Sequence, residues 1–348
     1  MQIDFHHGTT YVLARWAGFS QEQAEMIAYA SQYVDDAVQS GMIDFSNGAK
    51  FERRSSAHKI IDEYNFNDDA NRQAWVLFHF LPGNQGLPVE EGRDLSFIKT
   101  LVCCPDSYIA REMLAECIAE KRRPYSLLRL GITLHVYADT WAHQGFAGVK
   151  DNINSAQLQA DTKMEKLESH SVCVWPLGHG MVLSYPDQPW RSWQYQDSEG
   201  NTIEHSNTDK FIVAANGMMR FMQRYLVDDV DDSHNVKGLT LEQTEILREK
   251  FSGWTSPDEK ERHNAWLAGI AKGEFIFPGE IIKYSAVDAG SWKATALQTT
   301  DGWSERETRY IYSDDFLRSP WKMFHDALQA HSFFVLHELL PRYGICIA

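Results

Sequence analysis

Residues 124–145 read PYSLLRLGITLHVYADTWAHQG. A proline and a glycine bound an apolar segment at residues 127–143, whose spacing predicts a long helix. His135, Asp139 and His143 stand four residues apart in it, so their side chains share one helix face with a drift of roughly 40° per step. The segment therefore predicts a helix that carries a row of side chains able to bind a metal ion.

Apolar residues surround this polar row. Leu134, Val136, Ala138 and Ala142 flank it, which indicates that the helix is largely buried. A buried carboxylate without a partner is costly, and a metal ion held by imidazole and carboxylate ligands would satisfy it. The alternatives are a hydrogen-bonded ladder in the core and a solvated helix face, and we favour the metal site.

Helical patterns dominate the rest of the chain. We expect helices at residues 6–17, 21–41, 109–118, 209–227 and 314–340. N-caps are predicted at Ser20, Asp68, Asp106, Thr240 and Ser256, and the helix after Asp68 carries His79 in its last turn.

Two regions depart from the helical pattern. Residues 171–206 are rich in Trp, Tyr, Pro and Gly, and residues 197–201 resemble a hairpin turn. Residues 284–312 are expected to be irregular. The sequence therefore predicts an all-α fold, a multi-helix bundle with a small β-hairpin excursion. We expect one helical domain over residues 1–348, with a metal-site core at about 1–227 and a C-terminal helix at about 314–340.

A pair of carboxylates ends the second predicted helix. Asp35 and Asp36 follow an apolar helical segment at a position where the helix dipole disfavours negative charge. Surface charge is the simple interpretation, but the electrostatic mismatch favours a function. We predict Asp35 as a metal ligand and Asp36 as the catalytic residue, a general base, with a ligand role for Asp36 left open.

Isolated histidines complete the candidate set. His179 lies between two glycines, which leave room for a close ligand, and Asp187 follows in the same loop. His6 opens the first helix, and His79 lies between two phenylalanines. Each of these histidines taken alone is more typical of a hydrogen-bonded core residue, and His7 competes with His6 for the same role.

Charge and composition limit the function classes. The formal net charge is −15, which excludes broad electrostatic binding to nucleic acid or to an anionic membrane. Bound cations can reverse that sign locally, so a small phosphoester, a nucleotide or a lipid headgroup fits as substrate. We expect no membrane span, because no apolar run approaches about 18 residues. No signal peptide is recognisable, and the five cysteines form no disulfide pattern, so we expect a cytoplasmic protein.

The order of these motifs resembles one superfamily over about residues 1–227. Tyr33-Val34-Asp35-Asp36 is similar to the Trp-Ala-Asp segment of the zinc-dependent phospholipase C and S1/P1 nuclease superfamily. The spacing from His135 to His143 is similar to the His-x3-Asp-x-aromatic-x-His segment of its Het-C-like relatives. The later His179 and Asp187 resemble its final His and acidic pair. The layout also resembles that of a bacterial domain-of-unknown-function family.

The resemblance implies an all-helical fold with a trinuclear zinc cleft that hydrolyses phosphoesters. Its candidate metal ligands here are His6, Asp35, His79, His135, Asp139, His143, His179 and Asp187. Secreted members bind metal through the amine and carbonyl of a mature N-terminal tryptophan, whereas this chain starts with Met1-Gln2. Its spacing from Asp139 to His143 is also shorter than in the phospholipases and nucleases, so two or three zinc ions are expected.

We therefore predict a zinc-dependent phosphoesterase. One alternative is a non-catalytic protein in which metal ions only stabilise the fold, because a structural site is coordinatively closed and a catalytic site is open. Another is an HD-type phosphohydrolase, whose adjacent His-Asp pair occurs here only at His325-Asp326.

Overall fold

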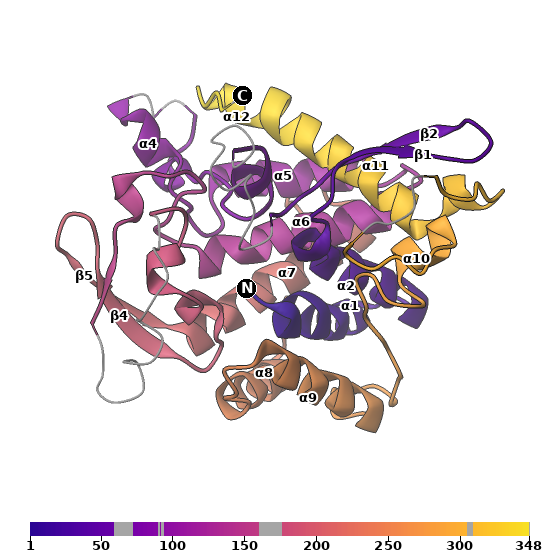
Figure 1. Ribbon diagram of the computed structural model, residues 1–348. Coiled ribbons are helices and arrows are strands. Elements are labelled where there is room, and N and C mark those ends of the chain that lie inside the picture. The colour runs from indigo at the N-terminus through magenta and orange to yellow at the C-terminus, as the bar shows by residue number, and fades with distance from the viewer. Residues whose placement is uncertain (59–71, 90, 92–93, 160–175, 305–308, 348) are drawn as a thin grey trace.

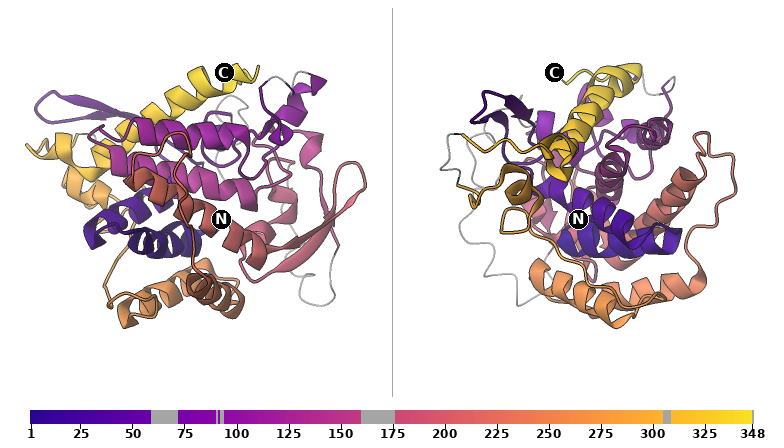
Figure 2. Two further views of the ribbon diagram at one scale, coloured as in Figure 1. Left: turned by 180° about the vertical axis from the view of Figure 1, so that it is seen from behind. Right: turned by 90° about the vertical axis from the view of Figure 1, so that its right-hand side faces the viewer.

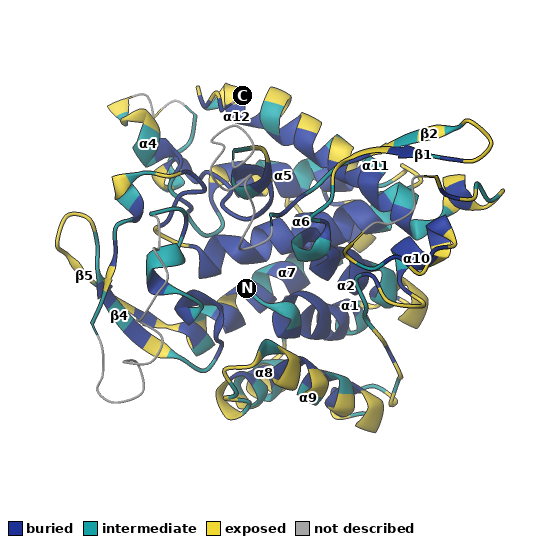
Figure 3. Cartoon of the chain, in the orientation of Figure 1, coloured by how far each residue is buried: buried dark blue, intermediate teal, exposed yellow. Residues whose placement is uncertain are grey.

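A long buried helix, α6 (Ser126–Ala142), runs through the centre of the molecule (Figure 1). The computed structural model describes residues 1–58, 72–89, 91, 94–159, 176–304 and 309–347. Every residue from Leu128 to Ala142 is buried, so α6 is dark along its length in Figure 3. It packs against the helices α2 (Gln21–Asp36), α5 (Tyr108–Ala119), α7 (Asn207–Leu226) and α11 (Pro320–Phe333). The predicted central helix is confirmed.

The remaining elements surround this centre in the three views of Figures 1 and 2. The chain begins with a π-helical turn, η1 (Asp4–Thr9), that continues into α1 (Thr10–Ala17). Further helices are α4 (Phe97–Thr100), α8 (Leu241–Gly253), α9 (Glu259–Lys272), α10 (Trp292–Leu297) and α12 (Leu340–Arg342). Shorter helical turns include η3 (Arg72–Val76), η7 (Gly180–Val182), η8 (Tyr185–Asp187) and η10 (Phe334–Leu339). None of the described helices is long and apolar enough to cross a bilayer.

Two small antiparallel sheets lie at opposite sides of the helices. One pairs β1 (Gly41–Asp44) with β2 (Lys50–Arg53). The other has the order β3 (Gln157–Leu158), β4 (Ser192–Gln196) and β5 (Thr202–Ser206). The chain is therefore helix-rich with two small sheets. The turn predicted at residues 197–201 joins β4 to β5, so that hairpin is confirmed.

Close contact between α2 and α6 depends on Gly131. A Cβ atom at this position would lie 2.5 Å from the backbone oxygen of Ile27 and 2.7 Å from the Cβ of Ala30. The glycine thus lets the two helix backbones approach, and one turn later the backbone oxygen of Ser31 reaches the ring of His135 at 2.8 Å. Local packing in the core therefore fixes the orientation of a predicted ligand.

Some predicted helix boundaries were wrong, and others were confirmed. The helix expected to reach Gly41 ends at Asp36, because residues 41–44 form strand β1 instead. Its hairpin partner is reached through Asn47-Gly48, a dipeptide typical of tight turns that the helix prediction overlooked. The caps at Ser20 and Thr240 are confirmed, since each side-chain oxygen accepts from the backbone N–H three residues on.

Two other caps and the C-terminal region need correction. Ser107 caps α5 in place of Asp106, which has a left-handed backbone (φ 49°), and Asp258 caps α9 in place of Ser256. Residues 284–312 contain helix α10, capped by Ser291, and are not wholly irregular. The C-terminal helix starts at Pro320 after its cap Ser319, not near residue 314. The cap predicted at Asp68 lies outside the described residues.

Candidate metal centre

The eight predicted ligands come from segments far apart in the sequence and meet beside α6. His135, Asp139 and His143 follow one face of α6 and its C-cap. His6 lies in η1, Asp35 near the end of α2 and His79 after η3. His179 and Asp187 come from the loop that holds η7 and η8.

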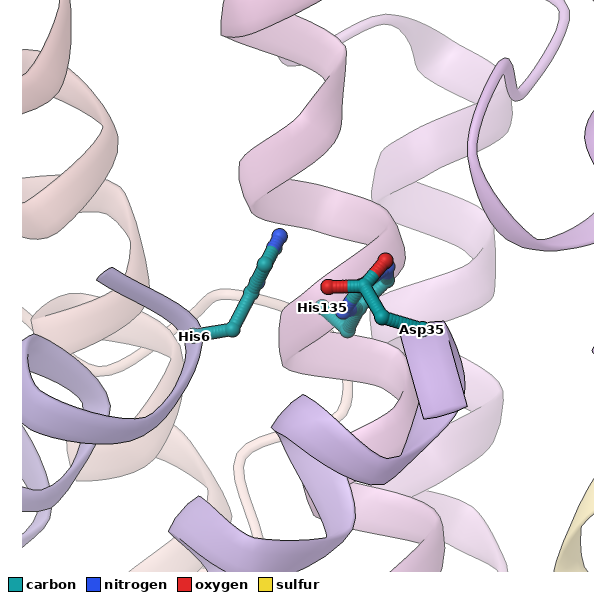
Figure 4. A group of neighbouring side chains, drawn as sticks. All are labelled: His6, Asp35 and His135. Carbon is teal, nitrogen blue, oxygen red and sulfur yellow. The ribbon is translucent and has the colours of Figure 1, made fainter. Parts of the chain in front are cut away.

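These side chains form three groups whose ligand atoms lie within 4.8 Å of one another, and each group could hold a metal ion. The groups are His6 with Asp35 and His135, His79 with His135 and Asp139, and His143 with His179 and Asp187. Figure 4 shows the first of them, with three side chains from three different helical segments directed at the same space.

Distances around His79 and His135 match a tetrahedral metal shell. His79 Nδ1 lies 3.2 Å from His135 Nε2, and each of these atoms is 3.4 Å from Asp139 Oδ2. Asp35 Oδ1 lies 3.7 Å from His79 Nδ1 and 3.8 Å from His135 Nε2. Ligand bonds of the length usual for zinc place tetrahedral ligand atoms about 3.3 Å apart. The ligand atoms of His79, His135 and Asp139 thus have the separations that one ion requires, and Asp35 lies slightly farther from both ring nitrogens.

Backbone carbonyls fix which ring nitrogen of each histidine carries the proton. His135 Nδ1 contacts the oxygen of Ser31 at 2.8 Å, and His79 Nε2 contacts that of Ser56 at 3.1 Å. His143 Nδ1 lies 2.6 Å from the oxygen of His79, and His179 Nδ1 lies 2.8 Å from that of Leu183.

A carbonyl oxygen can only accept, so each of these ring nitrogens must donate a hydrogen bond. In the neutral ring the opposite nitrogen is then bare: it is unprotonated, and its lone pair is available to a metal ion. For His79 and His135 those bare nitrogens face each other and the carboxylate of Asp139. Metal-binding histidines are held by this kind of outer hydrogen bond.

The first residues of the described chain complete the cluster. The amino nitrogen of Met1 lies 2.6 Å from Asp139 Oδ1 and 3.2 Å from Asp187 Oδ1. His6 Nε2 lies 3.2 Å from the same Asp139 oxygen, and its ring stacks on His135 at 3.8 Å between centroids. Neither ring nitrogen of His6 has a hydrogen-bond partner among the described residues, although both are buried.

The structure also separates the two adjacent histidines. His7 Nδ1 contacts His263 Nε2 at 2.9 Å, and His7 is in none of the three groups. His6, not His7, therefore lies in the cluster.

Burial and charge hold the cluster in a form suited to a cation. Burial lowers the pKa of His6 to about 4 and also lowers the pKa values of His79, His135 and His179, so these rings are neutral at neutral pH. Burial alone would raise the pKa of Asp139, but His143 and the Met1 ammonium hold it well below its usual range. The pKa of Asp187 is likewise lowered. Burial raises the pKa of Asp35 well above its usual range, so the ionised carboxylates beside the neutral imidazoles are those of Asp139 and Asp187. Neutral imidazole and ionised carboxylate are the protonation states that metal binding needs.

The cluster opens into a cleft of about 920 Å³. Asp35, His79, His143, His179 and Asp187 line its floor. The opposite wall comes from parts of the chain to which the sequence assigned no function, namely α9 with Lys260, His263 and Asn264, residues 284–288, and residues 302–303. No local pattern marks these residues, because long-range packing brings them to the site, such as that of α9 against η1 and of Tyr284 against α2.

Asp36 lies in the cleft but in none of the three groups. Its Oδ2 accepts hydrogen bonds from the Tyr284 hydroxyl at 2.5 Å and from Gln32 Nε2 at 3.1 Å. Burial raises the pKa of Asp36, and these two donors act in the opposite direction. The histidine of the HD-type alternative, His325, contacts the backbone of Arg54 and is also absent from the three groups.

Comparison with known proteins yields one match. No curated protein and no solved structure matches the chain. A model for a family of unknown function, DUF6765, matches residues 1–339, which include every residue of the three candidate ligand groups and of the cleft lining. The chain therefore belongs to the DUF6765 family.

Proposed function

We propose that this protein is a metal-dependent phosphoesterase with two or three zinc ions at the floor of its cleft. One observation carries the proposal. Bare imidazole nitrogens and carboxylate oxygens converge at 3.2–3.8 Å in a buried place, with the other nitrogen of each of four rings held by a backbone carbonyl. Such a cluster is costly unless cations neutralise it, and the single Met1 ammonium reaches only the carboxylates of Asp139 and Asp187.

The charge distribution supports more than one ion. Asp139 lies within 3.6 Å of His6, His79, His135 and His143, and its two oxygens face different groups. Asp139 would serve as a ligand through Oδ2, beside His79 and His135, and its Oδ1 would face His6. The superfamily resemblance implies metal binding by an N-terminal amine, and the amine of Met1 lies 2.6 Å from Asp139 Oδ1.

Accessibility favours a catalytic site over a purely structural one. The side chain of Asp35 is 31% exposed and that of His179 is 19% exposed, and both face the cleft. A structural zinc site is closed by protein ligands, whereas a catalytic one keeps a side open to substrate. The volume of the cleft is sufficient for a small phosphoester, a nucleotide or a lipid headgroup.

The residues of the chain have separable roles in this proposal. Divalent ions would supply a water of lowered pKa and neutralise charge on a phosphoryl group. Asp36 would accept a proton from the attacking water, and Tyr284 and Gln32 would hold its carboxylate in place. Lys260 at the rim provides a positive charge for an anionic substrate. The test is hydrolysis of a panel of phosphodiester, phosphomonoester and phospholipid substrates with added zinc.

We expect Asp36→Asn to lower turnover by roughly 10²–10⁴, the usual range for loss of a general base. Metal content should not change, because Asp36 belongs to none of the ligand groups. Turnover on the best substrate of the panel and elemental analysis of the same sample measure the two effects.

Asp231→Asn is the matched control, since Asp231 is exposed and lies outside the cleft lining and the three groups. It should retain both metal and turnover. Loss of metal in Asp36→Asn would instead make Asp36 a ligand, and unchanged turnover would remove it from the chemistry.

A further inference from the structure

A second pocket of about 400 Å³ lies beyond the end of strand β2. Arg53, Arg54 and Ser55 line it, together with Ser40, Gln73 and Gln329. Glu52 also lines it, so the described lining residues carry two arginines and one carboxylate.

Among the described residues, the half-buried guanidinium of Arg54 has no hydrogen-bond or ion-pair partner. Its Nε is fully buried, with no acceptor from that part of the chain. Burial lowers the pKa of Arg54, and the nearby Glu52 only partly offsets this. The N–H groups of a guanidinium pair best, two at a time, with the oxygens of a carboxylate or a phosphate, and the described residues supply no such anion to Arg54.

The backbone around Arg54 is held firmly. Both its N–H and its carbonyl oxygen lie near Nδ1 of the buried His325 on α11, at 3.3 and 3.0 Å. Two residues on, the Ser56 N–H donates to the oxygen of Ala37, and the Ser56 hydroxyl donates to that of Val34. A pocket on this segment is therefore preorganised, which reduces the entropy cost of binding.

The same segment joins this pocket to the metal cleft. His58 lines both cavities, and the carbonyl oxygen of Ser56 accepts the hydrogen bond that orients His79. An anion at Arg54 would thus lie next to a substrate held in the cleft.

We propose that the Arg54 pocket is a binding site for a phosphate-type oxyanion. The anion is either a second phosphoryl group of the molecule whose first phosphoryl group lies in the cleft, or a free phosphate ion. The first source rests on the proposed function, whereas the binding site itself does not.

Calorimetric titration with inorganic phosphate tests the site directly. Asp139→Asn protein, in which the metal cluster is impaired, should still bind phosphate at this pocket. Adding Arg54→Gln to that background should weaken the binding about 10- to 100-fold, the range for losing a hydrogen bond to a charged group. Arg54→Lys keeps the positive charge but not the paired N–H donors of the guanidinium, so it should weaken phosphate binding to an intermediate extent.

Arg318→Gln is the control, because Arg318 is an exposed arginine whose partner, Asp315, is also exposed. It should leave phosphate binding unchanged, and thermal melting of each variant verifies folding. The proposal is overturned if Arg54→Gln and Arg54→Lys proteins both bind phosphate like their parent, or if no phosphate site survives in Asp139→Asn protein that remains folded.

Alkane bisphosphonates of increasing length distinguish the two sources of the anion. If a substrate bridges the pockets, the bisphosphonate of one chain length should bind wild-type protein more tightly than phosphate does. Either Asp139→Asn or Arg54→Gln should abolish this gain in affinity. If no length shows a gain while the Arg54-dependent phosphate site persists, the ligand is a free ion. Failure of the metal proposal would remove the gain but not that phosphate site.

Discussion

Asp139→Asn protein is expected to hydrolyse phosphoesters more than about 100-fold more slowly than wild-type protein. This loss is larger than the loss that usually follows removal of a residue that only hydrogen-bonds to a metal ligand. The reason is the position of this carboxylate. Its oxygens lie 2.6–3.6 Å from the Met1 amine and four histidine rings, so its charge acts on members of all three groups. Asparagine keeps the shape but is a neutral and weaker ligand.

Turnover and metal content measured on the same Asp139→Asn sample check this expectation. Asp151→Asn is a suitable control, because Asp151 is a half-buried turn residue that accepts from the Ile153 N–H and lies outside the three groups and the cleft lining. Hydrolysis that survives in Asp139→Asn would mean that the activity comes from another site or from a contaminant.

Removing metal with a chelator is expected to lower the melting temperature by roughly 5–10 °C. A ligand present at about 1,000 times its Kd stabilises the folded state by about 4 kcal/mol, and each kcal/mol shifts the melting temperature of a large domain by a few degrees. The ligands come from η1, α2, α6 and the η7–η8 loop, so an ion between them links elements that are distant in sequence.

Differential scanning calorimetry before and after chelation measures this shift, with verified metal removal. Re-addition of zinc should restore the original curve. A melting curve that does not change after complete removal would place any bound metal outside the buried cluster.

The helical part of the cluster was accessible to sequence reasoning. His135, Asp139 and His143 could be placed on one face because the helix period fixes where residues four apart point. Asp35 was indicated by a charge that the helix dipole disfavours. In both cases the signal is local, so a single sequence contains it.

The remaining parts of the site depend on packing between distant segments. His6 and His7 have equivalent local sequence, and only the contact of His7 with His263, 256 positions away, separates them. The partnership of Asp36 with Tyr284 spans 248 positions. No periodicity encodes such contacts. The missed β1–β2 hairpin differs, because Asn47-Gly48 was a readable signal that the helical pattern outweighed.

The metal content of the purified protein tests the central claim most directly. Wild-type protein prepared without chelator and without a polyhistidine tag should contain two or three equivalents of zinc or a similar divalent ion per chain. His6→Gln should lower that number, whereas His7→Gln should not, because His7 lies outside the three ligand groups. Less than about one equivalent in the wild-type protein, with no uptake on reconstitution with zinc, would contradict the metal centre.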